Sequence, residues 1–405
     1  MRAVIALLAL LLLQDHAVDA ASWEAVDSSV KVAEGVLAWE AKGGRSALTT
    51  RGIPEDLRGF AAIAFRASVE GEEERALVVG VAEKAARHSF WRKLTVKPGE
   101  AQAFEVKLWQ FRTSGIPSWG RAARLAFGAR DAGGSFRIEG VRLVKHAGGG
   151  VPFLEPEAAL QGRAFGGESS AKATANFRVF TDAPLDLDKL GGHLEAMLKL
   201  FQKTFGLKEA PLDYPATLVV AKTPEAYRAF VKKTVEDVYA GLVAPPTSTG
   251  LTFEQYACTS WDEKLAERRP VFFHESCHLL IPRLLGFRGP DGATWVEEGI
   301  CYWMQYEFMP SEPLSRPMRA LLANARRPKL STLAGTAKAG GMAEGLGLAV
   351  VDHLIRGPHA AKLGAVLEAL RPQCDLPAAV KAALGLTIEE FEAAWLEWAT
   401  GRYKD

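Results

Sequence analysis

The 405-residue sequence predicts a multidomain protein, in which an all-β sandwich is followed by a mainly helical α+β domain. Hydrophobic and polar residues alternate in short runs over residues 22–147, whereas helical spacing dominates after residue 172. Between these regions, residues 148–172 are rich in Gly, Pro, Ala and Ser, which is typical of a linker. We therefore place the two domains at 22–147 and 173–405, and a length near 400 residues agrees with two domains.

The first domain is predicted to be an antiparallel sandwich. The run FAAIAFRASVE shows the period of two, because it places Ile63, Phe65, Ala67 and Val69 on one face of a strand. About seven or eight such runs are separated by Gly and Pro turn signals, with no long amphipathic helix between them. Their order, which closes with SFRIEGVRLVKH, resembles the galactose-binding-like jelly rolls of exported bacterial enzymes. The resemblance implies a jelly-roll module with carbohydrate as a candidate partner.

The tryptophans of this region have two interpretations. Aromatic rings on an open sheet face form platforms on which sugars stack, and in sandwiches they also fill the core. Carbohydrate binding and a spacer or docking role therefore both stay open, since a fold does not give a function. The residues concerned are Trp23, Trp39, Trp91, Trp109 and Trp119.

The N-terminus has the pattern of a secretory signal. One Arg precedes an apolar run from Ala3 to Leu13, and a small-residue site follows at residues 18–20. The run is too short to cross a bilayer but suits the hydrophobic segment of a signal peptide. We assign residues 1–20 to that signal peptide, with cleavage after Ala20 or Ala21. This predicts export to the periplasm or the extracellular space of a bacterium, and no later stretch predicts a transmembrane segment.

Charge and cysteine content argue against several classes of binding partner and of stabilising site. Lys and Arg total 49 against 48 Asp and Glu, so nothing in the charge balance favours nucleic acid or an anionic membrane as a partner. Four cysteines are too few for a disulfide framework, and none has the CxxC spacing of a cysteine zinc site. One disulfide among Cys258, Cys277, Cys301 and Cys374 stays open.

The second domain begins with a strand-containing part. NFRVFTDAP and ATLVVAK are predicted strands, and LDKLGGHLEAMLKLFQKTFG is an amphipathic helix between them. From Pro270 onward nearly every segment is predicted to be helical. The last helix, TIEEFEAAWLEWATGRY, begins with a capping box made by Thr387 and Glu390.

The stretch FFHESCHLL contains the candidate metal-binding and catalytic residues. His274 and His278 lie one helical turn apart on one face, so their imidazoles converge on a single point. Glu275 lies beside that face, where a carboxylate acts as the general base on a water held by zinc. The flanking residues are apolar, and burying these polar side chains without partners would cost several kcal/mol. A bound Zn²⁺ would satisfy all three.

A catalytic zinc site needs a third protein ligand. The segment WVEEG follows the first helix after a Gly/Pro-rich loop that lets a second helix return to it. Glu298 is the preferred third ligand, and Glu297 is its competitor because the two are about 100° apart around a helix. Cys277 is read as a small packing residue or a disulfide partner, since a fourth protein ligand would close the open position.

HESCH followed by WVEEG resembles the gluzincin zinc metallopeptidases, and residues 176–403 resemble the peptidase-MA-like domains of exported bacterial proteins. The resemblance implies that His274, His278 and Glu298 bind zinc and that Glu275 is the catalytic base. Relatives use a downstream Tyr or His to stabilise the oxyanion, but the helix GLGLAVVDHLI carries no Tyr. His353 and Tyr302 are the candidates, with Tyr306 less favoured. An ordinary helical histidine and a core or ligand-orienting tyrosine are the alternative interpretations.

These patterns predict an exported zinc-dependent peptidase that acts on peptide or protein substrates. The Gly-rich motif that holds a free amine in aminopeptidases is missing, so exopeptidase specificity has no support. A second interpretation keeps the zinc but hydrolyses another amide, for instance in cell-wall peptides. A third is an envelope or glycan-binding protein whose zinc domain is weakly active or inert.

Overall fold

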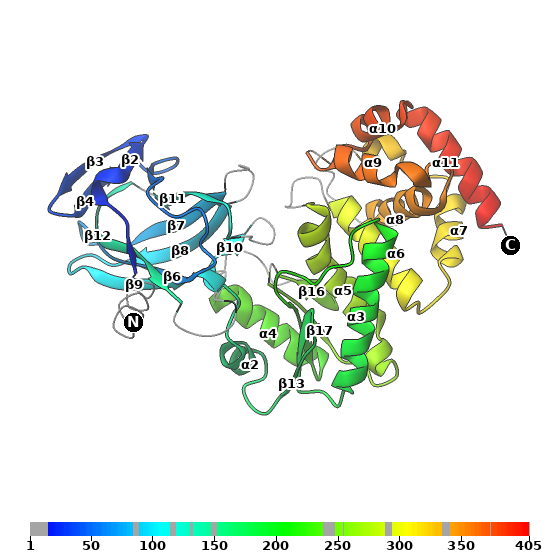
Figure 1. The fold of residues 1–405 in the computed structure, drawn as a ribbon, viewed down its shortest axis with the longest axis horizontal. Coiled ribbons are helices and arrows are strands. Elements are labelled where there is room, and N and C mark those ends of the chain that lie inside the picture. The colour runs from blue at the N-terminus through cyan, green and yellow to red at the C-terminus, as the bar shows by residue number, and fades with distance from the viewer. Residues whose placement is uncertain are drawn as a thin grey trace, which may run out of the picture. The chain divides into compact units, whose positions relative to one another are not determined.

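The computed structural model describes most of the chain, namely residues 15–83, 89–113, 119–129, 133–146, 151, 153–237, 248–253, 255–287, 294–333, 341–372 and 374–404. The chain divides into two compact units (Figure 1). The first comprises Met1–Leu160 with Lys232–Pro245, and the second comprises Gln161–Val231 with Pro246–Asp405.

The described part of the first unit contains two six-stranded sheets, all of whose ladders are antiparallel. The first sheet has the order β3-β4-β12-β6-β9, with β1 paired to β12, and the second has the order β10-β8-β7-β11-β5-β2. This confirms the predicted β-sandwich. The strands are β1 (His16–Ala17), β2 (Trp23–Val26), β3 (Ser28–Ala33), β4 (Val36–Ala41), β5 (Ala47–Thr50), β6 (Phe60–Val69), β7 (Arg75–Glu83), β8 (Ser89–Val96), β9 (Gln102–Lys107), β10 (Arg112–Thr113), β11 (Ala122–Gly128) and β12 (Gly134–Lys145), with short 3-10 turns at Ala20–Ser22 and Leu108–Gln110.

The two sheets share one aromatic core. Phe65 of β6 meets Phe127 of β11 edge to face, with ring centroids 4.9 Å apart. Trp23 stacks on Phe127, Trp39 stacks on Phe136, and Trp119 lies against Phe90. These three tryptophans are buried, so of the two interpretations left open by the sequence, core filling holds for them. An aromatic side chain fits the period-two pattern on either face of a strand, and these three lie on the inner face, in the core. Trp91 and Trp109 are half-buried.

The second unit is built on one five-stranded sheet with the order β13-β14-β15-β17-β16. The three inner strands are parallel, and both edge strands run antiparallel to their neighbours. The strands are β13 (Ser170–Ala173), β14 (Phe177–Thr181), β15 (Ala216–Ala221), β16 (Gly250–Thr252) and β17 (Tyr256–Ser260). This agrees with the predicted strands at NFRVFTDAP and ATLVVAK.

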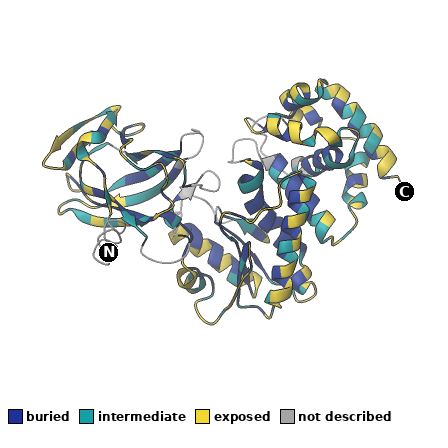
Figure 2. Cartoon of the chain, viewed as in Figure 1, coloured by how far each residue is buried: buried dark blue, intermediate teal, exposed yellow. Residues whose placement is uncertain are grey.

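Helices make up most of the remainder of the second unit. Helix α3 buries the apolar side predicted for it (Figure 2). Asp186 caps its start, because its carboxylate accepts a hydrogen bond from the Lys189 amide. The capping box of α11 is confirmed, because the Thr387 hydroxyl accepts from the Glu390 amide and the Glu390 carboxylate from the Thr387 amide. The helices are α2 (Glu157–Ala164), α3 (Leu187–Thr204), α4 (Pro224–Asp237), α5 (Pro270–Leu280), α6 (Thr294–Phe308), α7 (Ser315–Ala323), α8 (Gly341–Arg356), α9 (Leu363–Leu370), α10 (Leu376–Leu384) and α11 (Ile388–Arg402), with a π turn at Ile281–Leu285 and 3-10 turns at Ala266–Arg268, Leu330–Thr332 and Ala360–Lys362.

The prediction of a linker at 148–172 is partly wrong. Residues 147–150 and 152 lie outside the described residues, but the rest of the stretch contains α2 and most of β13. Strand β13 pairs with β14 through its backbone, and all four of its residues are exposed. An edge strand of this kind needs no apolar side chains, so its composition looks like that of a linker. The second domain therefore begins before residue 173.

The N-terminal prediction falls mostly on residues 1–14, which lie outside the described residues. Of the remainder, β1 pairs with β12, Val18 is buried, and the Asp19 carboxylate caps the turn at Ala20–Ser22. Cleavage after Ala20 would remove β1. In the portions of the chain that the structure describes, no helix combines the length and apolar character needed to cross a bilayer.

Candidate metal centre

Helix α5 carries two histidines into the interior of the second unit. Pro270 occupies its first turn, where a missing amide costs no hydrogen bond, and most of its residues are buried. His274 and His278 project from the same face, and their Nε2 atoms lie 3.3 Å apart. Their side chains keep only 9% and 15% of their surface exposed. The i, i+4 spacing thus produces the convergence expected from the sequence.

Helix α6 supplies the third group. Glu298 Oε2 lies 3.3 Å from His274 Nε2, and Glu298 Oε1 lies 3.5 Å from His278 Nε2. Ligand atoms held about 2.0–2.1 Å from a tetrahedral zinc are roughly 3.3–3.4 Å apart, so the three donors have the spacing of such a site. Among the described residues, His274, His278 and Glu298 are the group of three that could hold a metal ion. The geometry selects Glu298 over Glu297.

Burial controls the charge of these groups. It lowers the pKa of His278 to about 4, with the charge of His274 acting in the same direction, so the imidazole is neutral as a ligand must be. Burial alone would raise the pKa of Glu298, but the hydrogen bond and charges of the two histidines lower it overall. Burial, followed by the charge of Glu298, raises the pKa of Glu297 to about 7, with no histidine among the causes.

Glu275 is in contact with two residues of the edge strand β16, Thr252 and Gly250. The Thr252 hydroxyl lies 2.9 Å from Glu275 Oε2 and 2.8 Å from its backbone oxygen, and it donates its one hydrogen to either. A Cβ on Gly250 would lie 2.5 Å from Glu275 Oε1, so only glycine leaves room for this carboxylate. Burial raises the pKa of Glu275 to about 7, while His274 and the Thr252 hydrogen bond oppose the rise. Sequence reasoning missed both Gly250 and Thr252, because they are far along the chain from Glu275.

Tyr302 lies beside the metal-binding group. Its ring meets that of His274 edge to face at 4.5 Å, and its hydroxyl donates to Glu344 Oε2 at 3.4 Å. Glu344 belongs to α8 and had no signal in the sequence beyond its place in a glycine-rich segment. Tyr306 instead donates to Glu312 at 3.2 Å. The structure therefore brings Tyr302 to the site, together with an unexpected acidic neighbour.

His353 is a correction to the expected set of catalytic residues. Its side chain is completely buried and meets the rings of Phe391 and Trp398, at 5.2 and 5.0 Å, both on α11. Neither ring nitrogen has a hydrogen-bond partner among the described residues. The residue faces the last helix instead of the metal-binding group, because its position on α8 is turned toward α11. It fills the core.

None of the four cysteines belongs to the group of described residues that could hold a metal ion. All four are buried free thiols, and Cys277 and Cys301 are completely buried on the two helices that carry the metal-binding group. Cys277 is the packing residue that the sequence allowed, and it interacts with the thiol of Cys301.

The sequence matches no protein-family model and no curated protein. Solved structures give weak similarities. A family 11 carbohydrate-binding module from Clostridium thermocellum, in complex with a β-1,3-1,4-mixed-linked tetrasaccharide, is 14% identical, with a TM-score of 0.29 and coverage of 32% of this chain and 95% of that chain. The second N-terminal cellulose-binding domain of β-1,4-glucanase C from Cellulomonas fimi is 23% identical, with a TM-score of 0.25 and coverage of 34% and 95%.

A conserved protein of unknown function from Bacillus anthracis is similar over a longer stretch. It is 11% identical, with a TM-score of 0.35 and coverage of 94% of this chain and 72% of that chain. All three TM-scores are below 0.5, so we base neither a fold assignment nor a function on these similarities.

Proposed function

We propose that this protein is an exported zinc-dependent peptidase of the gluzincin type. The observation that carries the proposal is the spacing of the His274, His278 and Glu298 donor atoms, with the Glu275 carboxylate on the same helix. The order of the residues in HESCH and WVEEG, which resembles that of gluzincins, supports the same conclusion.

The donor set favours zinc over other metals. Two imidazoles and a carboxylate also bind non-haem iron, which is octahedral. In an octahedral site with bonds near 2.1 Å, neighbouring ligand atoms are about 3.0 Å apart. Distances of 3.3, 3.3 and 3.5 Å fit the wider tetrahedral arrangement better. The three protein donors leave a fourth position for the reactants.

The residues around this group have distinct roles in peptide hydrolysis. Zinc, when bound, supplies a Lewis acid that polarises the scissile carbonyl and acidifies a water molecule. Glu275 receives the proton of the attacking water on a carboxylate oxygen and delivers it to the leaving amine. Thr252 fixes the orientation of that carboxylate through its hydroxyl. The ring of Tyr302 contacts the metal-binding residue His274, and its hydroxyl is the candidate for stabilising the oxyanion.

The proposal is tested by digesting a quenched peptide library with wild type and with Glu275→Gln. We expect wild type to cleave peptides, to contain about one zinc per chain and to lose activity with a chelator. Glu275→Gln should keep its zinc and its melting temperature while losing at least about 100-fold in kcat. A wild type that holds zinc but cleaves nothing would contradict peptidase activity and favour a binding protein with an inert zinc domain.

A further inference from the structure

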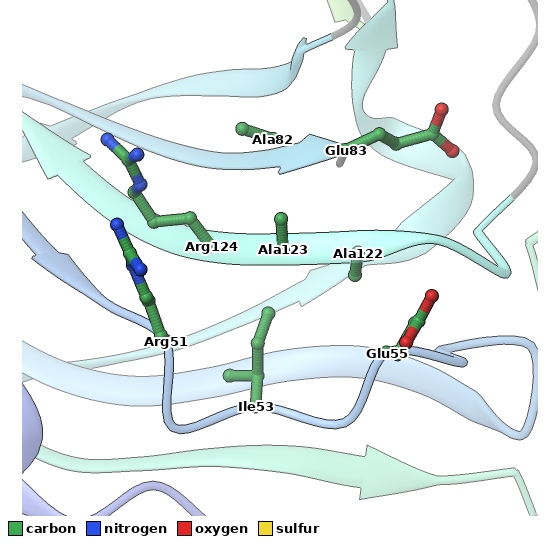
Figure 3. A pocket seen from close by; sticks show the side chains of 8 residues that line it. All are labelled: Arg51, Ile53, Glu55, Ala82, Glu83, Ala122, Ala123 and Arg124. Carbon is green, nitrogen blue, oxygen red and sulfur yellow. The ribbon is translucent and has the colours of Figure 1, made fainter. Parts of the chain in front are cut away.

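The first unit carries a hollow of about 670 Å³ on the outer face of its second sheet, remote in sequence from the metal-binding residues (Figure 3). Its floor, the part of the lining between the charged side chains, is apolar and comprises Ile53, Ala82, Ala122 and Ala123. The volume lies within the range of pockets that bind small molecules. The proposed peptidase chemistry makes no use of this hollow.

Two arginines stand at one end of the hollow. Thr50, the last residue of β5, pairs with Leu125 of β11, so Arg51 directly follows this pair on one strand and Arg124 directly precedes it on the other. Figure 3 shows their side chains at the same end of the hollow, and both are exposed. Two positive charges at the same end of the hollow repel each other. Among the residues that the structure describes, neither guanidinium has an ion-pair or hydrogen-bond partner.

The opposite end has the opposite charge. Glu83 and Glu55 lie there, as Figure 3 shows, and both residues have interactions within the protein. With two arginines and two glutamates, the lining therefore has no net charge, but its positive and negative groups lie at opposite ends. An anionic group is favoured at the arginine end, where planar guanidinium groups match a carboxylate, and is disfavoured at the glutamate end. A ligand with dense negative charge along its whole length would meet repulsion.

The sheet also limits the kind of ligand. Strands β5, β7 and β11 are each paired on both sides, so their backbone groups are used within the sheet. An extended peptide cannot add to them as a further strand. Recognition must come from side chains that meet a ligand lying flat on the face. Trp91 lies on that same face, since it pairs with Gly80 and Gly80 lies two residues before Ala82. Hydroxyl-rich rings that carry carboxylates only at intervals suit these groups.

We infer that this hollow binds an acidic oligosaccharide, with a uronate carboxylate between Arg51 and Arg124 and neutral sugar over the Ala82–Ala123 floor. The unit would thus hold the protein to an acidic glycan, whatever the second unit does. This site differs from the tryptophan platform considered from the sequence, because its anchoring groups are arginines.

Calorimetric titration of the full chain tests the inference. The probe is a tetrasaccharide that alternates glucuronate with N-acetylglucosamine, and N-acetylchitotetraose is the neutral control of equal length. We expect the uronate probe to bind about tenfold or more tighter, and to weaken as salt rises. Arg51→Gln and Arg124→Gln should each weaken its binding about tenfold, while thermal melting should show no loss of stability because both residues are exposed.

Arg137→Gln is the matched control. Arg137 is an exposed arginine of β12 in the other sheet, and its removal should leave uronate binding unchanged. Failure of wild type to bind the uronate probe would overturn the inference, as would equal affinity for the neutral probe. Equal losses in Arg137→Gln and Arg51→Gln would show non-specific attraction and would also overturn it. Each result is independent of peptidase activity, since Glu298→Ala should bind the probe as wild type does.

Discussion

Gly299 of α6 and Gly347 of α8 are in backbone contact. A Cβ on Gly299 would lie 2.5 Å from the carbonyl carbon of Gly347, and a Cβ on Gly347 would lie 2.1 Å from the carbonyl oxygen of Trp295. This close approach presses α8 against the turn of α6 that carries Glu298. It also explains why Glu344, one turn before Gly347, reaches the hydroxyl of Tyr302.

Gly347→Ala should separate these helices. We expect stability to fall by about 1–3 kcal/mol, as overpacking of a tight contact does, and zinc affinity to fall because Glu298 moves. Gly345→Ala is the control on the same helix, since its Cβ would meet nothing within 4 Å. That variant should be neutral or stabilised by about 0.5–1 kcal/mol through higher helix propensity. Thermal melting with metal analysis checks both, and equal behaviour of the two variants would contradict the contact.

Glu298→Ala should lose zinc, whereas Glu297→Gln should retain it. Only Glu298 places its oxygens within 3.3 and 3.5 Å of the histidine nitrogens. Zinc affinity should drop by more than about 100-fold in the first variant, since loss of a direct ligand exceeds the effect of an outer contact. Metal content after dialysis against a weak chelator measures the difference. The reverse pattern would assign the ligand to Glu297.

Thr252→Val should slow peptide cleavage without removing the metal. The substitution keeps the shape of the side chain but removes the hydroxyl that donates to Glu275. We expect kcat to fall about tenfold with little change in KM, because the carboxylate loses its fixed orientation. Thr252→Ser should restore most of the rate. An unchanged kcat in Thr252→Val, with normal zinc content, would remove Thr252 from the site.

His353 should make the fold sensitive to acid. Burial, with a smaller effect of the charge of His359, lowers the pKa of His353 from 6.5 to about 4. The unfolded chain therefore binds this proton first, and the stabilisation present above pH 6.5 is lost as the pH falls toward 4. The loss is on the order of 3 kcal/mol. Urea unfolding of wild type and of His353→Leu at several pH values checks this, and parallel pH profiles would refute it.

Asp352 should be essential for docking of the C-terminal helix. This completely buried carboxylate accepts from Trp303 Nε1 at 3.0 Å, from Arg356 Nη1 at 3.2 Å and from the Tyr403 hydroxyl. Asp352→Asn should lower the free energy of unfolding by about 3–5 kcal/mol, because the amide keeps only one acceptor oxygen and removes the negative charge that pairs with Arg356. Glu307→Gln removes the more exposed partner of Arg356 and should lower the free energy of unfolding by about 1 kcal/mol or less. Similar losses of stability in the two variants would argue against a buried hydrogen-bond network around Asp352.

The sequence predicted those features that depend on local spacing. The alternation along β6, the amphipathic face of α3 and the capping box of α11 follow from residues close together in the chain. The metal-binding pair is of the same kind, since a four-residue separation on a helix already places His274 and His278 together. The linker was partly misassigned because an exposed edge strand has no hydrophobic pattern. Three tryptophans were equally ambiguous, since a strand offers two faces.

By itself, then, the sequence determined that two imidazoles share a helix face, that Glu275 lies beside them, and that a Glu of WVEEG is the third partner. Only the tertiary structure decided that this partner is Glu298, that Thr252 and Gly250 surround Glu275, and that Glu344 meets Tyr302. It also placed His353 against α11. The physical reason is the same in each case. Helical geometry relates residues within a turn or two, whereas contacts between elements depend on how closely backbones approach, and here that approach is set by glycines.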